Sequence, residues 1–140
     1  MKILVAVDGS PFTKKMLAYL AAHDEWLGAR HDYTVVHAVP AVPPTAVDML
    51  DRDALKAYYD ESAEKVFKPI RTFFTRQGLQ AKFAAKAGPA AGVIADAARK
   101  GGHDLLVMGS HGHSALVNLV MGSVATQVLA RCTTPVLLVR

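Results

Sequence analysis

The sequence predicts an α/β fold built on an open, five-stranded parallel sheet with helices on both faces, a Rossmann-like architecture. Short apolar runs of strand length alternate with longer stretches of helical periodicity along the whole chain. Most of the short runs are apolar at consecutive positions, which is typical of strands buried on both faces of a sheet. This alternation favours right-handed crossover connections, and at 140 residues the chain is expected to form one domain over residues 1–140.

The first third of the chain is predicted to run strand, helix, strand. Residues 2–8 form an apolar run of strand length. A helix is expected over residues 11–27, because Ser10 is a favoured N-cap and Pro11 is a favoured first helical residue. Residues 33–39 form the second apolar run and therefore the second predicted strand.

The middle of the chain is predicted to hold a loop, a long helix and a strand. Residues 40–47 are rich in proline and are expected to form the loop. Apolar residues recur at steps of three or four over residues 48–77, which predicts an amphipathic helix that Pro69 should kink or split. Residues 79–87 alternate apolar and polar positions, and this period of two predicts a half-exposed strand at an edge of the sheet.

The last third of the chain completes the alternation. A helix is expected over residues 89–100, and an apolar strand follows at residues 104–109. A last helix over residues 122–132 leads to a strand at residues 135–139. In doubly wound sheets, ligands bind at the carboxyl ends of the strands where the winding reverses, so we expect a functional site at that edge.

Composition and charge exclude several classes of protein. With 51% hydrophobic and 20% charged residues, the chain is neither disordered nor a coiled coil, and no apolar run approaches the roughly 20 residues that span a bilayer. The net charge of +4 comes from scattered basic residues, so nucleic acid is not an expected partner. A single cysteine, Cys132, and the absence of a signal-peptide pattern in the first ten residues predict a cytoplasmic protein.

The most informative segment follows the fourth predicted strand. Residues 108–112 read Met-Gly-Ser-His-Gly, and residues 122–124, at the start of the last helix, read Gly-Ser-Val. Gly109 permits a sharp turn out of the strand. Gly112 and Gly122 lack side chains, so main-chain N–H groups at these positions can approach a ligand closely.

Together these features predict a phosphate cradle. The start of a helix offers free N–H groups and the positive end of its dipole to an anion, and the Ser123 hydroxyl can add a donor. Each glycine alone is more often an ordinary turn residue, so the prediction rests on the whole set between a strand and a helix. The segment lacks the Gly-Lys-Ser/Thr of a Walker A loop and the dinucleotide-binding fingerprint.

The spacing Gly-x2-Gly-x9-Gly-Ser, formed by Gly109, Gly112, Gly122 and Ser123, resembles the nucleotide-binding signature of the universal stress protein family. The resemblance implies a sheet ordered 3-2-1-4-5, often in a homodimer. Members with a complete signature typically bind ATP or related adenine nucleotides. The resemblance extends over the whole chain, through Asp8-Gly9-Ser10, Val36-His37-Ala38-Val39 and Thr134-Pro135-Val136-Leu137-Leu138-Val139.

The implied strand order agrees with the residue patterns. It places residues 79–87 at one edge, and it makes the first and fourth strands neighbours, so that Asp8 and Gly109 flank one crevice. It also leaves residues 136–139 at the other edge. An unbroken apolar strand there favours pairing with the same strand of a second copy, so a homodimer through the C-terminal strand is expected.

The predicted nucleotide site takes residues from both sides of this crevice. Asp8 fits beside phosphates only if it accepts a ribose hydroxyl or an adenine amino proton, or helps to hold Mg²⁺; the alternative is a helix cap. Ala38 lies where, in the family, the backbone typically meets the adenine edge. The full set is Val7, Asp8, Ala38, Met108, Gly109, Ser110, His111, Gly112, His113, Ser114, Gly122, Ser123 and Val124.

Three histidines lie in or near the predicted site. His111 and His113 are phosphate contacts or exposed side chains rather than metal ligands, because no cysteine or further histidine follows at zinc-like spacing. The family often carries a basic residue at position 113, so His113 departs from the pattern and weakens the expected attraction for phosphate. His37 is expected to be a core histidine beneath the site. Neither a catalytic residue nor a metal ion held by the protein alone is expected.

Three functions remain open at this point. The first, which the intact signature favours, is a dimeric binding or signalling module of the stress response that holds ATP, ADP or AMP with Mg²⁺. The second is a slow ATP hydrolase, although no positioned base, arginine finger or pair of metal-binding carboxylates is recognisable. The third is a nucleotide-free, chaperone-like or interaction dimer.

Overall fold

The computed structural model describes residues 1–113, 118 and 120–140 of the chain. Within this part of the chain, five parallel strands form one sheet in the order β3-β2-β1-β4-β5. The predicted α/β fold and strand order are therefore confirmed. The strands are β1 (Lys2–Ala6), β2 (Asp32–Val39), β3 (Ala81–Ala87), β4 (Leu105–Gly109) and β5 (Val136–Val139).

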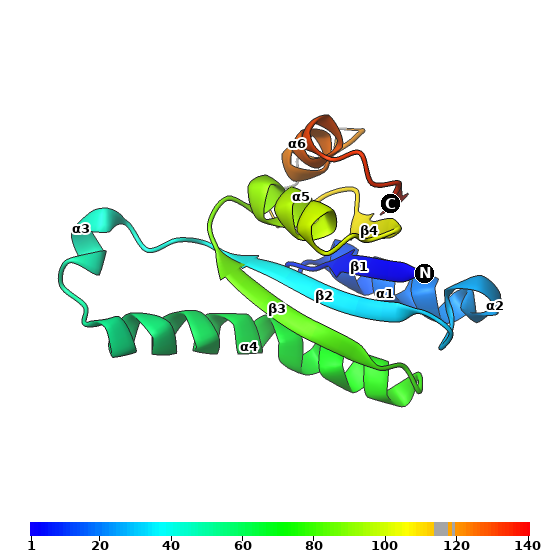
Figure 1. The fold of residues 1–140 in the computed structure, drawn as a ribbon, viewed down its shortest axis with the longest axis horizontal. Helices are drawn as coiled ribbons and strands as arrows, with labels where there is room; N and C mark the ends of the chain where they lie inside the picture. Colours follow the sequence, from blue (N-terminus) through cyan, green and yellow to red (C-terminus); the bar gives the residue numbers. More distant parts are fainter. Residues whose placement is uncertain (114–117, 119) are drawn as a thin grey trace.

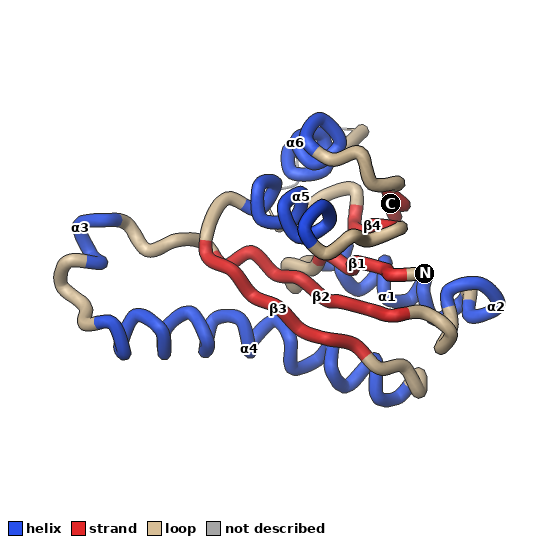
Figure 2. The backbone as a smooth tube through the Cα atoms, in the orientation of Figure 1, coloured by secondary structure: helices blue, strands red, loops and turns tan. Residues whose placement is uncertain are grey.

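Helices cover both faces of the sheet (Figures 1 and 2). They are α1 (Pro11–Ala22), α2 (Asp24–Leu27), α3 (Pro44–Val47), α4 (Arg52–Arg76), α5 (Ala90–Lys100) and α6 (Ser123–Arg131). One apolar core joins α1, α2 and α4 to one face through residues such as Met16, Leu27 and Ile70. A second core joins α5 and α6 to the other face through Ile94 and Val128. None of the helices described is both long and apolar enough to cross a membrane.

The predicted helix over residues 11–27 is in fact two helices, α1 and α2, which meet at His23. The backbone of His23 is not helical, with φ of −122° and ψ of 45°. Its Nδ1 donates to the Tyr19 carbonyl at 2.8 Å, so the side chain uses a carbonyl of the last turn of α1. A side chain that satisfies the end of a helix in this way favours termination over continuation.

Helix α4 continues through Pro69, so the predicted split is wrong. Proline removes one helical N–H donor, but Phe67, Ile70 and Phe74 are buried along the same face of the helix. Burial of that face against the sheet outweighs the single lost hydrogen bond. Strand β3 pairs with β2 alone, and its side chains are half-buried or exposed, so the edge position predicted from its alternation is confirmed.

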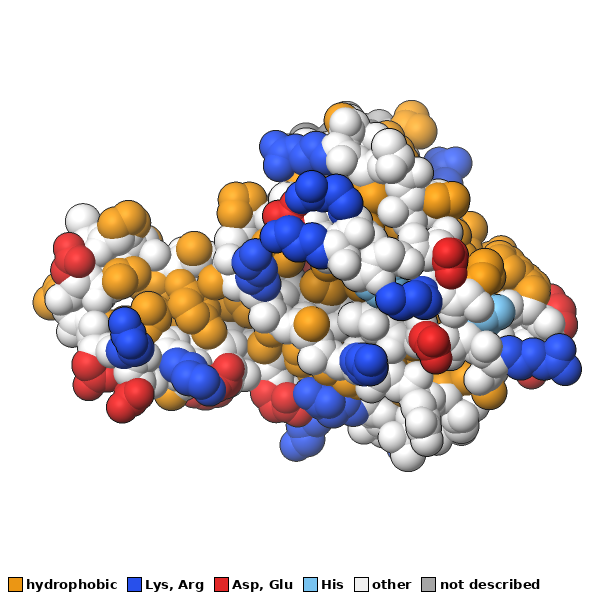
Figure 3. Space-filling model, in the orientation of Figure 1, with side chains coloured by type: hydrophobic (Ala, Val, Ile, Leu, Met, Phe, Trp, Pro, Cys, Tyr) orange, Lys and Arg blue, Asp and Glu red, His pale blue; other side chains and the backbone are white. Residues whose placement is uncertain are grey.

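Helix α3 and the first turns of α4 project beyond the sheet (Figure 1). The predicted loop over residues 40–47 therefore contains one short helix. Tyr59 ties this arm together, because its hydroxyl accepts a hydrogen bond from the Val42 N–H at 2.9 Å. Met49, Leu50 and Tyr58 are exposed on the arm, and Figure 3 shows apolar side chains on its surface.

Strand β4 leaves the sheet at Gly109, which lies against the start of α1. A Cβ at this position would lie 2.8 Å from Phe12 Cβ and 3.3 Å from the His111 carbonyl oxygen. The φ angle of Gly109 is not in the left-handed region. Glycine is therefore required for the close approach of α1 to β4, and not for the sharp turn that the sequence suggested.

Replacing Gly109 with alanine is expected to lower the free energy of unfolding by about 1–3 kcal/mol, because Phe12 and the backbone must move to admit the new methyl group. The matched control is Gly92→Ala in α5, where the nearest atom to the new Cβ is Arg131 Nη1 at 3.5 Å. That change is expected to raise stability by up to about 1 kcal/mol, because alanine is the better helix former. Urea unfolding measures both effects, and changes of the same sign would contradict this account.

Tyr33 anchors the end of α2 to the sheet. Its side chain is 3% exposed, and its hydroxyl donates to the carbonyls of Leu27 and Gly28, the latter at 3.0 Å. Burial raises the pKa of Tyr33 from 10.0 to about 12. The fold therefore stabilises the neutral phenol over the phenolate.

The stability that the neutral Tyr33 side chain provides is complete below pH 10 and is lost as the pH rises towards 12, because the unfolded chain releases the proton first. Between pH 9 and pH 11 this group alone is expected to lower the free energy of unfolding by about 1 kcal/mol. Urea unfolding of the wild type and of Tyr33→Phe at both pH values isolates the effect. A difference between the two proteins that does not change with pH would refute it.

Candidate functional site

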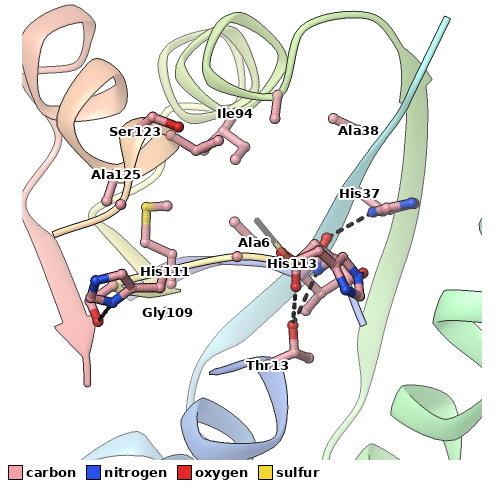
Figure 4. A pocket seen from close by; sticks show the side chains of 18 of the residues that line it. Ala6, Thr13, His37, Ala38, Ile94, Gly109, His111, His113, Ser123 and Ala125 are labelled. Atoms are coloured by element: carbon pink, nitrogen blue, oxygen red, sulfur yellow. Dashed lines mark hydrogen bonds between the residues drawn. The ribbon is translucent and has the colours of Figure 1, made fainter. Parts of the chain in front are cut away.

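A cavity of about 510 Å³ opens at the carboxyl ends of β1, β2 and β4, beside the first turns of α5 and α6 (Figure 4). The winding of the sheet reverses at this point, because β2 and β4 lie on opposite sides of β1. Ser114, a predicted site residue, lies outside the described residues. The predicted residues that line the cavity are Val7, Asp8, Ala38, Met108, Gly109, Ser110, His111, Gly112, His113, Gly122, Ser123 and Val124.

Several lining residues were not assigned to the site from the sequence. The sequence did offer a sign that Thr13 belongs to the site, because this residue lies in the first turn of the predicted helix, shortly after the Asp8-Gly9-Ser10 segment. The others are mostly apolar: some come from the ends of β1 and β2 and the loop after β2, and some are brought to the cavity by the packing of α5 and α6 against the sheet. The additional residues are Ala6, Thr13, His37, Pro40, Ala90, Ile94 and Ala125.

Asp8 organises the turn between β1 and α1. Its Oδ1 accepts hydrogen bonds from the Ser10 N–H at 2.8 Å and from the Thr13 hydroxyl at 3.0 Å. Its Oδ2 faces Gly112, where an added Cβ would lie 2.8 Å from this oxygen. One carboxylate oxygen is therefore used at the start of the helix, as in the capping alternative, while the other lies directly against Gly112.

Ser10 holds the N-cap position of α1, but its side chain does not cap the helix. Its hydroxyl is fully buried and has no hydrogen-bond partner among the described residues. Asp8 performs the capping instead, because its carboxylate accepts from the Ser10 N–H. The predicted cap residue, Ser10, therefore lies two residues after Asp8, whose side chain satisfies the backbone.

Gly122 does not offer its own N–H to the cavity, and this corrects the predicted cradle. The Gly122 N–H donates to the Ser110 carbonyl at 2.7 Å, and an added Cβ would lie 3.0 Å from the same oxygen. Gly122 thus holds the segment after β4 against the start of α6. The first helical donor of α6 is the Thr126 N–H, which bonds the Gly122 carbonyl at 3.1 Å.

The N–H groups of the first turn of α6 therefore have no helical acceptor. They belong to Ser123, Val124 and Ala125, and all three residues line the cavity. These amides point in the same general direction and carry the positive end of the helix dipole. The anion-binding feature of the site is thus the first turn of α6, directly after Gly122.

Two histidines hold consecutive carbonyl groups of the turn after β1 (Figure 4). His37 Nδ1 lies 2.8 Å from the Val7 carbonyl oxygen, and His113 Nε2 lies 2.6 Å from the Asp8 carbonyl oxygen. Because a carbonyl can only accept a hydrogen bond, each of these ring nitrogens must carry its proton. His37 is buried, as predicted, and His113 joins the glycine segment to the turn after β1.

His111 is held at the other end of the glycine segment. Its Nδ1 lies 2.8 Å from the Ser110 hydroxyl oxygen, and its ring packs against Phe12 with centroids 4.9 Å apart. In the described part of the chain, no group of three or more histidine, cysteine or acidic side chains has the arrangement of a metal site. His111 and His113 thus make separate contacts, His111 with Ser110 and Phe12, and His113 with the Asp8 carbonyl.

The peptide groups of Ala38 face the cavity. In a parallel ladder, the N–H and C=O of alternate residues point to opposite neighbours. The Val36 carbonyl accepts from the Val7 N–H at 3.0 Å, and the Val39 carbonyl accepts from the Gly88 N–H at 3.0 Å, on the other side of β2. Ala38 therefore directs its N–H and C=O towards β1, beyond the point where β1 has ended.

Charged side chains contribute little to the described wall of the cavity. Asp8 is its carboxylate, and no lysine or arginine lines the part of the wall that is described. Apolar side chains such as Ala38, Pro40 and Ile94 make up much of the remainder. The arrangement suits a flat, partly apolar ring with a polar edge at Ala38 and an anionic group at the first turn of α6.

Comparisons with known proteins agree with this geometry. The sequence model of the universal stress protein family matches residues 1–140. A Thermus aquaticus protein described as the universal stress protein in the QAH/OAS sulfhydrylase 3′ region is 36% identical over 138 residues, which cover 99% of this chain and 97% of that protein. The solved structure of the hypothetical protein MJ0577 matches with a TM-score of 0.81 and 26% identity, over 99% of this chain and 94% of that chain.

A further structure, the universal stress protein from Archaeoglobus fulgidus in complex with dAMP, has the same fold. It matches with a TM-score of 0.68 and 20% identity, over 100% of this chain and 98% of that chain. Other structures that share the fold are complexes with AMP and with cAMP. Because the family model matches the chain from end to end, and a relative shares more than a third of its residues, the chain belongs to the universal stress protein family.

Proposed function

We propose that the protein binds an adenine nucleotide, either ATP or the related ADP or AMP, in the cavity at the carboxyl edge of the sheet. The observation that carries the proposal is the presence of two features at the ends of one cavity: the peptide edge of Ala38, which has no backbone partner among the described residues, and the first-turn amides of α6. Relatives of the same fold that bind AMP, dAMP or cAMP support it. The protein then acts as a dimeric binding or signalling module of the stress response.

The base is expected at Ala38. Adenine presents an acceptor, N1, beside a donor, the N6 amino group, on one edge of its ring. The Ala38 N–H and C=O offer the complementary donor and acceptor. Pro40 and Ile94 supply apolar surface against which a flat ring can pack.

The phosphates are expected at the first turn of α6, where the amides of residues 123–125 and the Ser123 hydroxyl can donate. Because Gly112 has no side chain, the glycine segment can approach the phosphates from the other side of the cavity. Asp8 Oδ2 is one carboxylate oxygen, which fits Mg²⁺ only in the mode where nucleotide phosphates supply most of the other ligands. In that mode Asp8 would hold the ion to the turn after β1, and the ion would supply charge neutralisation of the phosphates.

The dimer is expected to form through the free edge of β5. The Pro135 carbonyl accepts from the Leu106 N–H of β4, and the Val139 carbonyl accepts from the Ser110 N–H just after it. This places the peptide groups of Val136 and Leu138 on the outer edge. Both residues belong to β5, an apolar strand whose outer edge has no partner among the described residues. Pairing with the same strand of a second copy would satisfy the outward peptide groups symmetrically.

Nucleotide binding is tested by heat-denaturing the purified protein, identifying released nucleotides by mass spectrometry, and titrating the nucleotide-free protein calorimetrically with AMP, ADP and Mg-ATP. Ala38→Phe is expected to fill the base end of the cavity and weaken binding more than about tenfold, which corresponds to more than about 1.4 kcal/mol. Ala84→Phe is the matched control, because Ala84 is exposed on β3 and does not line the cavity. No released nucleotide and no binding at millimolar concentration would contradict the proposal.

The dimer is tested by sedimentation velocity at micromolar concentration. Leu138→Pro removes an outward N–H without removing a bond of the protein's own sheet, so it is expected to give a folded monomer. Leu138→Ala keeps that N–H and is expected to remain a dimer. A wild-type protein that sediments as a monomer would remove the dimer from the proposed function but leave the nucleotide site in place.

A further inference from the structure

The hydrogen-bond ladder between β1 and β2 ends at a carbonyl that a side chain bonds in place of the next backbone N–H. Its last bond runs from the Val7 N–H to the Val36 carbonyl at 3.0 Å. In a continued parallel ladder, the next bond would run from the Ala38 N–H to the Val7 carbonyl. Instead, the Val7 carbonyl accepts a hydrogen bond from His37 Nδ1 at 2.8 Å, and the register of the two strands ends at Ala6 and Val36.

The position of His37 makes this bond specific. The residue lies between Val36 and Ala38 on β2, and its side chain is only 8% exposed. Its ring meets Phe67 of α4 edge to face, with centroids 6.1 Å apart, which fixes the orientation of the imidazole. Because the proton must reside on Nδ1 to reach the carbonyl, the bond defines both the ring orientation and the tautomer.

We propose that His37 is a positioning residue for the nucleotide base. By donating to the Val7 carbonyl, it holds that carbonyl in the observed arrangement, in which the Ala38 N–H makes no bond to it, and so keeps the Ala38 N–H free to meet the base. The inference rests on the proposed nucleotide site and adds to it the residue that makes the peptide edge available. His37 itself acts through the backbone and contributes no contact to the base.

Selectivity for adenine follows from a free N–H at this position. The unprotonated N1 of adenine accepts from the Ala38 N–H. Hypoxanthine and guanine carry a proton on N1, so they would set donor against donor and leave a buried polar group unpaired. The wild-type protein is therefore expected to bind AMP at least about tenfold more tightly than IMP.

The first measurement needs no ligand. Amide hydrogen exchange by NMR is expected to show that the Ala38 N–H exchanges much faster than the ladder-bonded Val7 N–H in the free wild type. In His37→Leu, the freed Val7 carbonyl can close the rung. Exchange at Ala38 is then expected to slow at least about tenfold, with a scalar coupling across the new bond between Ala38 nitrogen and the Val7 carbonyl carbon.

The second measurement is the affinity of the same proteins for AMP and IMP by calorimetry. His37→Leu is expected to bind AMP about tenfold more weakly and to lose most of its preference over IMP, because one hydrogen bond to the base is no longer made. His37→Asn places a donating amide nitrogen near the position of Nδ1, so it is expected to restore wild-type exchange and affinity. Phe67→Leu alters the packing of the ring but keeps the donor, so it should lower stability alone.

Slow exchange at Ala38 in the wild type, or unchanged AMP affinity in a folded His37→Leu protein, would overturn the positioning role while leaving the nucleotide site intact. If His37→Leu does not fold, wild-type exchange and His37→Asn still decide, because a structural role alone predicts no rescue of AMP over IMP selectivity by asparagine. Failure of the wild type to bind any adenine nucleotide would instead overturn the proposed function, and the role of His37 with it.

Discussion

The early end of β1 is the constraint on which the site depends. The ladder between β1 and β2 stops at Val7, while β2 continues to Val39, and β4 passes on the other side. Peptide groups beyond that point lose their sheet partners, and a buried peptide group must find another partner or face a space that a ligand or water can fill. The cavity at the carboxyl edge follows directly from this mismatch in strand length.

Side chains satisfy most of the peptide groups that the mismatch releases. The Asp8 carboxylate accepts from the Ser10 N–H, and the Thr13 hydroxyl accepts from the Asp8 N–H. His37 and His113 donate to the carbonyls of Val7 and Asp8. Among the described residues, the backbone groups without a protein partner at the cavity include the edge of Ala38 at one end and the first turn of α6 at the other. The polar side chains around the cavity therefore determine which backbone groups are left for a ligand.

The sequence was sufficient to indicate most of the residues that line the cavity, but not what each atom there contacts. The spacing of Gly109, Gly112 and Gly122 marks positions where side chains are not tolerated, yet it does not reveal the neighbour that excludes them. For Gly109 that neighbour is Phe12, and for Gly122 it is the Ser110 carbonyl, which also consumes the N–H expected to bind the ligand.

Strand register and core burial were likewise beyond the reach of local patterns. The bond from His37 to Val7 depends on the pairing of two strands that lie 30 residues apart in the sequence. The continuity of α4 through Pro69 depends on burial against the sheet, which local propensity does not encode. Apolar patterning predicted where strands and helices form, because that depends on the same burial averaged over many residues.

The chemistry of the described wall favours binding over turnover. Ground-state binding requires only complementary groups, which the backbone at Ala38 and α6 can supply without lysine or arginine. Phosphoryl transfer requires cations that stabilise the negative charge developing in the transition state, and a positioned base beside the reacting phosphate. Asp8 is committed through one oxygen to the start of α1, and His113 is committed to the Asp8 carbonyl, so neither is poised as a free base. The described groups of the cavity, which are mainly fixed backbone dipoles and one carboxylate, therefore meet the requirements of the proposed nucleotide binding.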